Sequence, residues 1–283
     1  MGLELEVVAE TNKFDVIVVG GGVAGMTASA VITQTGLKSS FLEKEVPGGK
    51  LMYLDTINNF STPGIAGKDL AVSVFNQATK DVKTKYNYGN VQFIKSKNDK
   101  FYLFTEDGQT WEAKALVIAT GTNIKRLNVP GDEQLFNHGL SYCVLCDCVL
   151  AKDKKVVLIG NTNHLDNLKQ FAKEVIVLKP EEVKAFKGDN KLQSVVKTDG
   201  TNIDCDMVFV EIGFESQLKF LPSEVKLSDK NEIIVDNNMQ TNFPGIFACG
   251  DCIAKEKKFI EPAMQEAAIA ADSAVKYINS KHW

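Results

Sequence analysis

Cys143 and Cys146, near the middle of the chain, have the spacing of a redox-active pair. With two residues between them, the sulfurs can close a small reducible ring, and one thiol of such a pair is commonly more acidic than free cysteine. Asp147 follows directly, and its carboxyl group could protonate the thiolate that leaves when the ring opens. We therefore expect disulfide exchange at these residues, with structural thiols as the alternative. Cys148 is interpreted as a packing residue or a rival disulfide partner.

A second pair, Cys249 and Cys252, has the same spacing about a hundred residues later. Four cysteines in two such pairs also suit a zinc site. The Gly250-Asp251 between the second pair has a better explanation in cofactor binding, given below. We therefore expect Cys249 and Cys252 to be packing thiols and expect no metal site.

A glycine motif, Gly20-x-Gly22-x-x-Gly25, lies between an apolar strand at 14–19 and a helical segment at 26–35. Such glycines allow a tight turn and a close approach to a pyrophosphate, which then lies at the helix N-terminus. Glu43 ends the next strand, about 20 residues on, where a carboxylate can accept ribose hydroxyls. Gly250-Asp251 offers a second anchor far along the chain, which favours FAD over NAD. A glycine-rich turn without a ligand is the alternative.

The middle of the chain starts a second nucleotide-binding unit but lacks its glycines. The strand at 155–160 ends on Gly160, and Asn161, Thr162 and Asn163 follow, whose side chains would take the space that a pyrophosphate needs. The later pair Glu181-Glu182 would repel the 2′-phosphate of NADP. We interpret this unit as a Rossmann-type shell kept as scaffold.

The order of strands and helices predicts an α/β protein with two Rossmann-like domains, the second inserted into the first and reduced in size. We expect residues 1–121 and 237–283 to form an FAD-binding domain. Residues 122–236 would form an inserted redox-disulfide domain with a degenerate pyridine-nucleotide fold. Helices are expected at 26–35, 68–85, 164–173 and 262–280, and strands at 14–19, 40–43, 91–94, 101–105, 110–113, 115–121, 155–160, 174–178, 194–198 and 207–212.

The composition is ordinary for a globular protein, with 283 residues, 44% hydrophobic and 24% charged residues. A net charge of −4 gives no reason to expect nucleic acid as a partner. No apolar run reaches the ~18 residues of a membrane span, and residues 1–13 do not resemble a signal peptide. We expect a cytoplasmic protein.

The sequence resembles the low-molecular-weight thioredoxin reductases over essentially its whole length. The resemblance implies FAD as cofactor, and it implies a homodimer. Cys143, Cys146 and Asp147 match the family's redox-active dithiol and acid. The positions that match its FAD contacts are Gly20, Gly22, Val23, Ala24, Gly25, Glu43, Lys44, Gly48, Gly49, Lys50, Leu51, Asn59, Ala119, Thr120, Gly121, Gly250 and Asp251.

Three departures from the family concern its use of NADPH. The glycine motif and the H-R-R-x-x-x-R motif for pyridine nucleotide are absent, and the R-Q pair before the last helix is replaced around 258–261. These departures resemble the ferredoxin-dependent flavin thioredoxin reductases. The resemblance implies that electrons pass from reduced ferredoxin through FAD to a Cys143–Cys146 disulfide and on to thioredoxin. The alternatives are an NAD(P)H-dependent thioredoxin reductase, an FAD-dependent dithiol oxidase that uses oxygen, and a non-catalytic flavoprotein.

Two lysine clusters and the last residues raise smaller questions. The clusters are either solvated faces or docking sites for an acidic carrier, and Trp283 either frays or stacks near the flavin or at a subunit contact. The clusters are Lys152, Lys154 and Lys155, and Lys255, Lys257 and Lys258.

Overall fold

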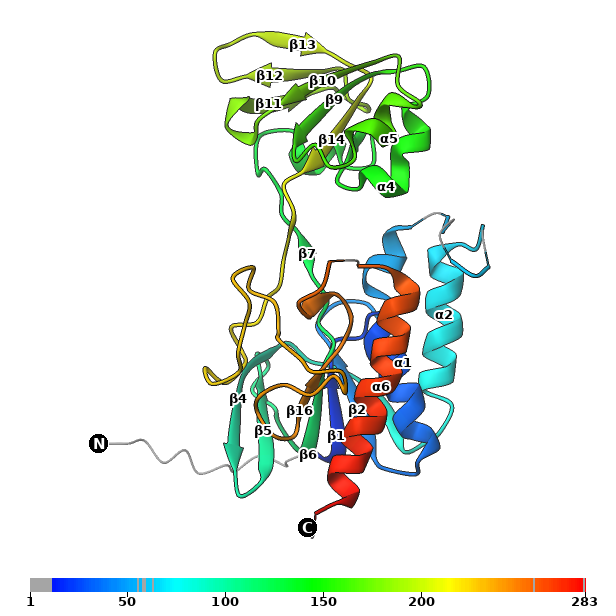
Figure 1. Cartoon of the computed structure of the whole chain (residues 1–283), viewed down its shortest axis with the longest axis vertical. Helices are drawn as coiled ribbons and strands as arrows, with labels where there is room; N and C mark the ends of the chain where they lie inside the picture. The colour runs from blue at the N-terminus through cyan, green and yellow to red at the C-terminus, as the bar shows by residue number, and fades with distance from the viewer. Residues whose placement is uncertain (1–11, 55, 58–59, 63, 257, 282) are drawn as a thin grey trace, which may run out of the picture. The chain divides into compact units, whose positions relative to one another are not determined.

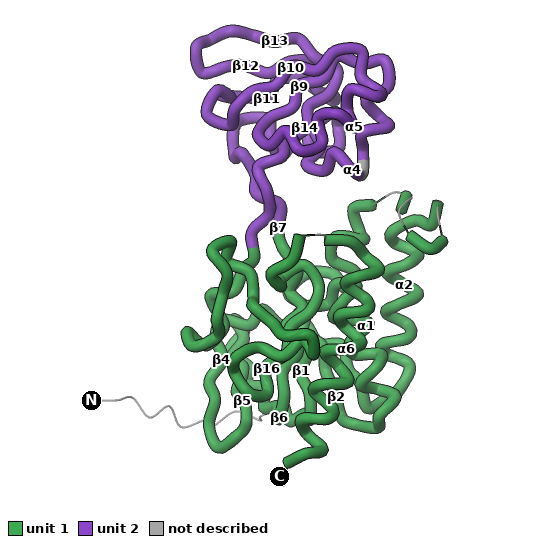
Figure 2. The backbone as a smooth tube through the Cα atoms, in the orientation of Figure 1, with its two compact units in different colours: residues 1–122, 216–283 green, residues 123–215 purple. Residues whose placement is uncertain are grey.

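The chain folds into two compact units, described from a computed structural model that covers residues 12–54, 56–57, 60–62, 64–256, 258–281 and 283 (Figure 2). Unit 1 runs to Thr122 and resumes at Ser216, and unit 2 is Asn123–Glu215. The expected return at 237 is therefore wrong by about 20 residues. The segment from 216 to 236 belongs to unit 1 because its apolar side chains, Leu218, Phe220, Val225 and Ile233, are buried in that unit's core.

Unit 1 is built on a sheet that has seven strands within the described residues (Figure 1). The order is β3-β2-β1-β6-β5-β4, and β16 also pairs with β6. Strands β3, β2, β1, β6 and β16 are parallel neighbours, whereas β4, β5 and β6 form an antiparallel meander. The strands are β1 (Asn12–Val19), β2 (Ser39–Glu43), β3 (Thr84–Tyr88), β4 (Val91–Lys97), β5 (Lys100–Thr105), β6 (Thr110–Ile118) and β16 (Ile246–Ala248).

Strand β6 corrects one expectation from the sequence. The segments expected as separate strands at 110–113 and 115–121 form one strand. Its first half pairs with β5 and its second half with β16, on the same side. One long strand therefore joins the meander to the parallel sheet.

Three longer helices cover one face of this sheet (Figure 1). The last helix packs against the first helix and against β6, which confirms that the C-terminal segment returns to unit 1. The helix expected at 68–85 ends early, because Thr84 begins a strand that pairs with β2 and hydrogen-bonds Ser39 (Oγ1 to Oγ, 2.8 Å). The helices of unit 1 are α1 (Val23–Gln34), η1 (Gly49–Tyr53), α2 (Gly67–Ala78), η4 (Gly250–Cys252) and α6 (Ile260–Asn279).

Unit 2 contains a parallel sheet in the order β10-β9-β14-β8, an antiparallel sheet β11-β12-β13, and a short ribbon of β7 with β15. A transmembrane helix is not found in the part of the chain that the structure describes. The strands are β7 (Asn123–Ile124), β8 (Leu140–Ser141), β9 (Lys155–Gly160), β10 (Glu174–Leu178), β11 (Val183–Lys187), β12 (Ser194–Lys197), β13 (Asn202–Asp204), β14 (Met207–Glu211) and β15 (Phe214–Glu215). The helices are α3 (Asp132–Leu135), α4 (Val144–Asp147), η2 (Cys148–Ala151), α5 (Leu165–Lys169) and η3 (Pro180–Glu182).

Candidate functional site

In the turn between β1 and α1, backbone segments approach each other so closely that only glycine fits between them. Gly20 has a φ of +109°, and a Cβ there would lie 2.4 Å from the carbonyl oxygen of Ala119. A Cβ on Gly25 would lie 1.8 Å from the carbonyl oxygen of Gly20. At Gly22, by contrast, a Cβ would meet no atom of the described residues within 4 Å. The turn is therefore tightly packed toward the sheet and open in front of the helix.

The N-terminus of α1 opens toward that free space. No side chain caps it, and no acidic residue lies in its first turn. The first N–H groups of a helix have no partners inside the helix, so they can bind an anion. A second loop lies beside the turn, since Gly48 donates its N–H to the carbonyl of Gly21 (2.8 Å) and a Cβ on Gly49 would come within 3.3 Å of the Gly22 Cα. This cradle fits the pyrophosphate of FAD.

Glu43 lies next to the cradle, at the carboxyl end of β2. Its carboxylate accepts the N–H of Gly21 (2.6 Å) and that of Glu45 (2.9 Å). Its role toward a ribose stays a prediction. Lys44 donates to the side-chain oxygen of Gln217 (3.1 Å), and its expected contact with the cofactor also stays a prediction. The expected contact Asn59 lies outside the described residues.

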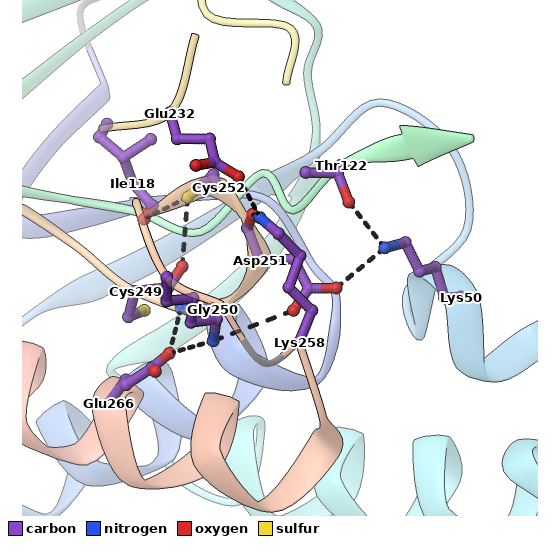
Figure 3. A network of polar contacts seen from close by, with 11 residues as sticks. Lys50, Ile118, Thr122, Glu232, Cys249, Gly250, Asp251, Cys252, Lys258 and Glu266 are labelled. Carbon is purple, nitrogen blue, oxygen red and sulfur yellow. Dashed lines mark hydrogen bonds and ion pairs between the residues drawn. The ribbon is translucent and has the colours of Figure 1, made fainter. Parts of the chain in front are cut away.

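A network of charged groups holds the Gly250-Asp251 turn (Figure 3). The ammonium group of Lys50 contacts the Asp251 carboxylate at 2.8 Å and the Thr122 hydroxyl at 2.7 Å. Lys258 donates to the backbone oxygen of Asp251 (2.5 Å). The structure thus brings Lys50 and Asp251, which the sequence separates by 200 residues, into one cluster at the end of β6 that leads to Thr120 and Gly121.

The sequence pattern gave no sign of the outer members of this network. Glu266 accepts the N–H of Gly250 (3.0 Å) and pairs with Lys255 (2.7 Å). Lys258 pairs with Glu232 at 2.7 Å. The second lysine cluster is therefore engaged within unit 1, which counts against a docking role for Lys255 and Lys258, while Lys257 lies outside the described residues.

The two cysteines beside this turn are buried, free thiols. Cys249 and Cys252 are fully buried in unit 1. Burial raises the pKa of Cys252 to about 11 and that of Cys249 well above its usual value. Cys205 of unit 2 is similar, since burial raises its pKa to about 12. A buried protonated thiol is a poor nucleophile, so the structure confirms Cys249 and Cys252 as packing residues.

The expected redox pair lies where β8 leads into α4. Cys143 is disulfide-bonded, whereas the side chain of Cys146 lies outside the described part of the structure. Cys148 is free and buried in the core beneath α4, as expected of a packing residue. Asp147 ends the helical turn, with its N–H donated to the carbonyl of Cys143 (3.2 Å). Disulfide, helical turn and carboxyl group thus lie together in unit 2.

Tyr142, the residue directly before Cys143, is anchored by its own side chain. Its buried hydroxyl contacts both carboxylate oxygens of Asp132 at 2.7 Å and accepts the N–H of Leu127 (3.2 Å). Burial is the main reason that the pKa of Tyr142 is raised, so the phenol stays protonated. The Arg126 guanidinium lies 4.6 Å from the ring centre of Phe136 and 3.7 Å from Asp132. The anchor fixes the chain directly ahead of the disulfide.

The turn after β9, where the sequence predicts a degenerate nucleotide site, is closed by a hydrogen bond between its own residues. The side chain of Asn161 accepts the N–H of Asn163 (2.9 Å), which closes the turn on itself. Helix α5 starts only at Leu165 and has five residues, shorter than the expected 164–173. Nδ1 of His164 lies 2.7 Å from the Glu211 carboxylate at the end of β14. Sequence reasoning missed this last contact because the two residues are 47 positions apart.

Lys155, from the first lysine cluster, and Trp283 have partners close by. Lys155 lies 3.9 Å from Glu174. The indole N–H of Trp283 donates to the carbonyl of Ile278 (2.8 Å), and its ring meets Tyr277 edge-on. Trp283 therefore closes the end of α6 in unit 1.

Comparison with known proteins agrees with this geometry. A family model described as pyridine nucleotide-disulphide oxidoreductase matches residues 14–163 and 167–274. A "34.2 kDa protein in rubredoxin operon" of Clostridium pasteurianum is 30% identical over 96% of this chain and 99% of its own length. Thioredoxin reductase of Listeria innocua is 30% identical over 95% of each chain. The crystal structure of thioredoxin reductase from Streptococcus pyogenes is 27% identical, with a TM-score of 0.84 over 96% of this chain and 100% of its own. The chain belongs to the pyridine nucleotide-disulphide oxidoreductases and, among them, to the low-molecular-weight thioredoxin reductase family of FAD-binding flavoproteins.

Proposed function

We propose that this flavoprotein disulfide reductase reduces thioredoxin with electrons from a one-electron protein carrier of the ferredoxin type, and not from NADPH. The observation that carries the proposal is the second nucleotide-binding turn. There the chain supplies a closed asparagine turn and a five-residue helix in place of a glycine cradle.

The two turns differ in the features that allow a pyrophosphate to bind. In unit 1, a helix of 12 residues starts directly after Gly22. In unit 2, α5 starts five residues after Gly160, and it is too short to present a row of aligned N–H groups. A pyrophosphate at this position would also meet the Asn161 side chain, whose oxygen already accepts a backbone N–H. Steric fit and anion binding are both poor.

Charge opposes NADPH as well. The Glu211 carboxylate lies at the carboxyl end of β14, and its Oε2 is buried without a hydrogen-bond partner among the described residues. Glu182 caps its own turn by accepting the N–H of Lys179 (2.8 Å), and this bond is the main cause of its lowered pKa. Both groups would repel phosphates of the nucleotide.

The residues of the chain divide the proposed work between the units. The turn from Gly20 to Gly25, the loop at Gly49 and Lys50, and Asp251 hold FAD, which accepts electrons and supplies the reducing power for a disulfide. In unit 2, Cys143 and Cys146 exchange with the disulfide of thioredoxin, and Asp147 gives a proton to the departing sulfur. We also propose a cytoplasmic homodimer, which light scattering tests for its subunit number.

An anaerobic titration of the flavin absorbance tests the choice of donor. Reduced ferredoxin should bleach the FAD of the holoenzyme within the mixing time of a manual experiment, whereas NADPH or NADH alone should leave it oxidised. A thioredoxin reductase known to use NADPH serves as the positive control for the nucleotides. Rapid bleaching by either nucleotide would overturn the proposal and assign a conventional reductase.

Two cysteine variants test whether electrons pass from the flavin to thioredoxin through the disulfide. In Cys146→Ser, ferredoxin should still bleach the flavin, but thioredoxin reduction should be lost. The neighbouring Cys148→Ser removes a buried free thiol and should retain turnover. Hydrogen peroxide formed in proportion to dithiol consumed would support the dithiol oxidase instead.

A further inference from the structure

We propose that Ser141 is a positioning residue for the proton transfer at the disulfide, acting through Asp147. Its hydroxyl donates to Oδ2 of Asp147 at 2.7 Å and accepts the N–H of Cys143 at 3.1 Å. One oxygen atom therefore joins the expected proton donor to the backbone of the disulfide cysteine. The inference rests on the proposed role of Asp147 in thioredoxin reduction.

The direction of the Ser141 hydrogen bond follows from the distances. The hydroxyl has one proton and two acceptors within reach, the Asp147 carboxylate at 2.7 Å and the Cys143 carbonyl at 3.4 Å. A bond to a carboxylate is shorter and stronger than one to a neutral carbonyl. The proton therefore goes to Asp147, which leaves the lone pairs of the oxygen for the Cys143 N–H.

The sheet of unit 2 and the buried side chain of Tyr142 hold Ser141 in place. Ser141 is the last residue of β8, pairs with Phe209 of β14, and is 4% exposed. The next residue, Tyr142, is buried and bonded to Asp132. Because Ser141 is fixed by the sheet, its hydroxyl can hold the Asp147 carboxyl group in one orientation while the disulfide opens and closes.

The chemical step shows why the orientation matters. Reduction of one disulfide takes two electrons and two protons, so one S–S bond breaks and two S–H bonds form. The electrons come from the reduced flavin of the holoenzyme. Asp147 as a carboxylic acid gives one proton to the leaving sulfur, and the resulting carboxylate takes a proton back from solvent. The other sulfur takes its proton from solvent, and solvent receives the protons that the flavin would release on oxidation. A positioned acid is worth about 10²- to 10⁴-fold in rate, and poor placement loses part of that factor.

A donor-independent assay measures this effect. Holoenzyme reduced with dithionite, with the excess removed, is mixed anaerobically with oxidised thioredoxin, and the return of flavin absorbance is timed. Ser141→Ala should slow the return about tenfold, the loss expected for a hydrogen bond to a charged group. The matched control Ser194→Ala removes another buried hydroxyl of unit 2 and should be as fast as wild type. A wild-type enzyme that thioredoxin does not reoxidise would refute the proposed function, and wild-type speed in Ser141→Ala would refute only the role of Ser141.

Two comparisons separate positioning from a general loss of structure. Ser141→Ala should not slow Asp147→Asn any further, because the acid that Ser141 serves is already gone. Ser141→Thr and Ser141→Val have the same shape and differ in the hydroxyl, so Thr should be about tenfold faster than Val even if Ser141→Ala does not fold. Equal rates for Thr and Val, or the same tenfold loss in the Asp147→Asn background, would overturn the inference.

Discussion

Two substitutions in the glycine turn of unit 1 should have different effects. Gly25→Ala should destabilise the fold, whereas Gly22→Ala should weaken FAD binding. In Gly25→Ala, the new Cβ would lie 1.8 Å from the Gly20 carbonyl oxygen, and contacts below 3.0 Å are essentially never seen. The strand and helix must therefore part by about 1.2 Å at this point. Overpacking of this kind typically lowers the free energy of unfolding by about 1–3 kcal/mol. We expect the upper end, because the two atoms that the new Cβ would meet first are the backbone carbonyl oxygen and carbon of Gly20.

In Gly22→Ala, the new Cβ meets nothing within 4 Å, and the φ of −72° suits alanine. The apoprotein should therefore keep its stability within about 0.5 kcal/mol. The methyl group would occupy the space in front of the α1 N-terminus, where we propose that the pyrophosphate of FAD binds. A penalty of about 1–3 kcal/mol for that overlap corresponds to roughly 5- to 150-fold weaker binding of FAD.

Two measurements on the apoproteins test the pair. Urea unfolding followed by circular dichroism gives the free energy of unfolding, and quenching of flavin fluorescence gives the Kd for FAD. The reasoning fails if Gly22→Ala binds FAD as tightly as wild type, or if Gly25→Ala is as stable as wild type.

Three further outcomes are expected. Lys255→Met removes the ion-pair partner of Glu266 in a mostly buried site. It should lower the free energy of unfolding in urea by about 2 kcal/mol. The control Lys276→Met breaks an exposed pair and should lower it by less than about 0.5 kcal/mol. Because the pKa of Cys252 is raised from 9 to about 11, the folded protein keeps this thiol protonated. The contribution of this protonated thiol to the free energy of unfolding is full below pH 9 and is lost as the pH rises toward 11. Iodoacetamide at pH 8 should label Cys252 only after unfolding, and labelling of the native protein would contradict the burial of this thiol. Tyr142→Phe removes the hydroxyl partner of a buried carboxylate and should lower the free energy of unfolding by about 1–3 kcal/mol, and an unchanged urea midpoint would show that the anchor carries no stability.

Features set by consecutive residues could be predicted from the sequence. The turn from Gly20 to Gly25 and the closed turn at Asn161 each depend on a few neighbouring residues, so their types and order were sufficient. The end of α2 could not be predicted in this way. Residues after Ala78 continue a helical pattern, but Thr84 starts a strand because β2 offers it a parallel partner and buried hydroxyl groups to bond.

Contacts between distant segments could not be predicted from the sequence for a different reason. The pairs are ordinary charged or polar residues at unrelated spacings, namely Lys258 with Glu232, Lys255 with Glu266, and His164 with Glu211. Charged residues of this kind are usually solvated, so no pattern marks the few that pair in a mostly buried site. The return of the chain to unit 1 near 216 likewise depends on which core accepts the apolar residues that follow.

The parallel sheet of unit 2 positions the disulfide segment independently of the turn that follows β9. Strand β8 is only two residues long and pairs with β14. That pairing holds Ser141, and Ser141 is two residues from Cys143. Central strand β14 also pairs with β9, the strand that leads into the turn at Asn161. Removal of the sheet would therefore release the disulfide segment, whereas the residue types in the turn after β9 do not affect how that segment is held. On the proposed function, the redox pair needs the sheet whether or not a nucleotide binds at the turn.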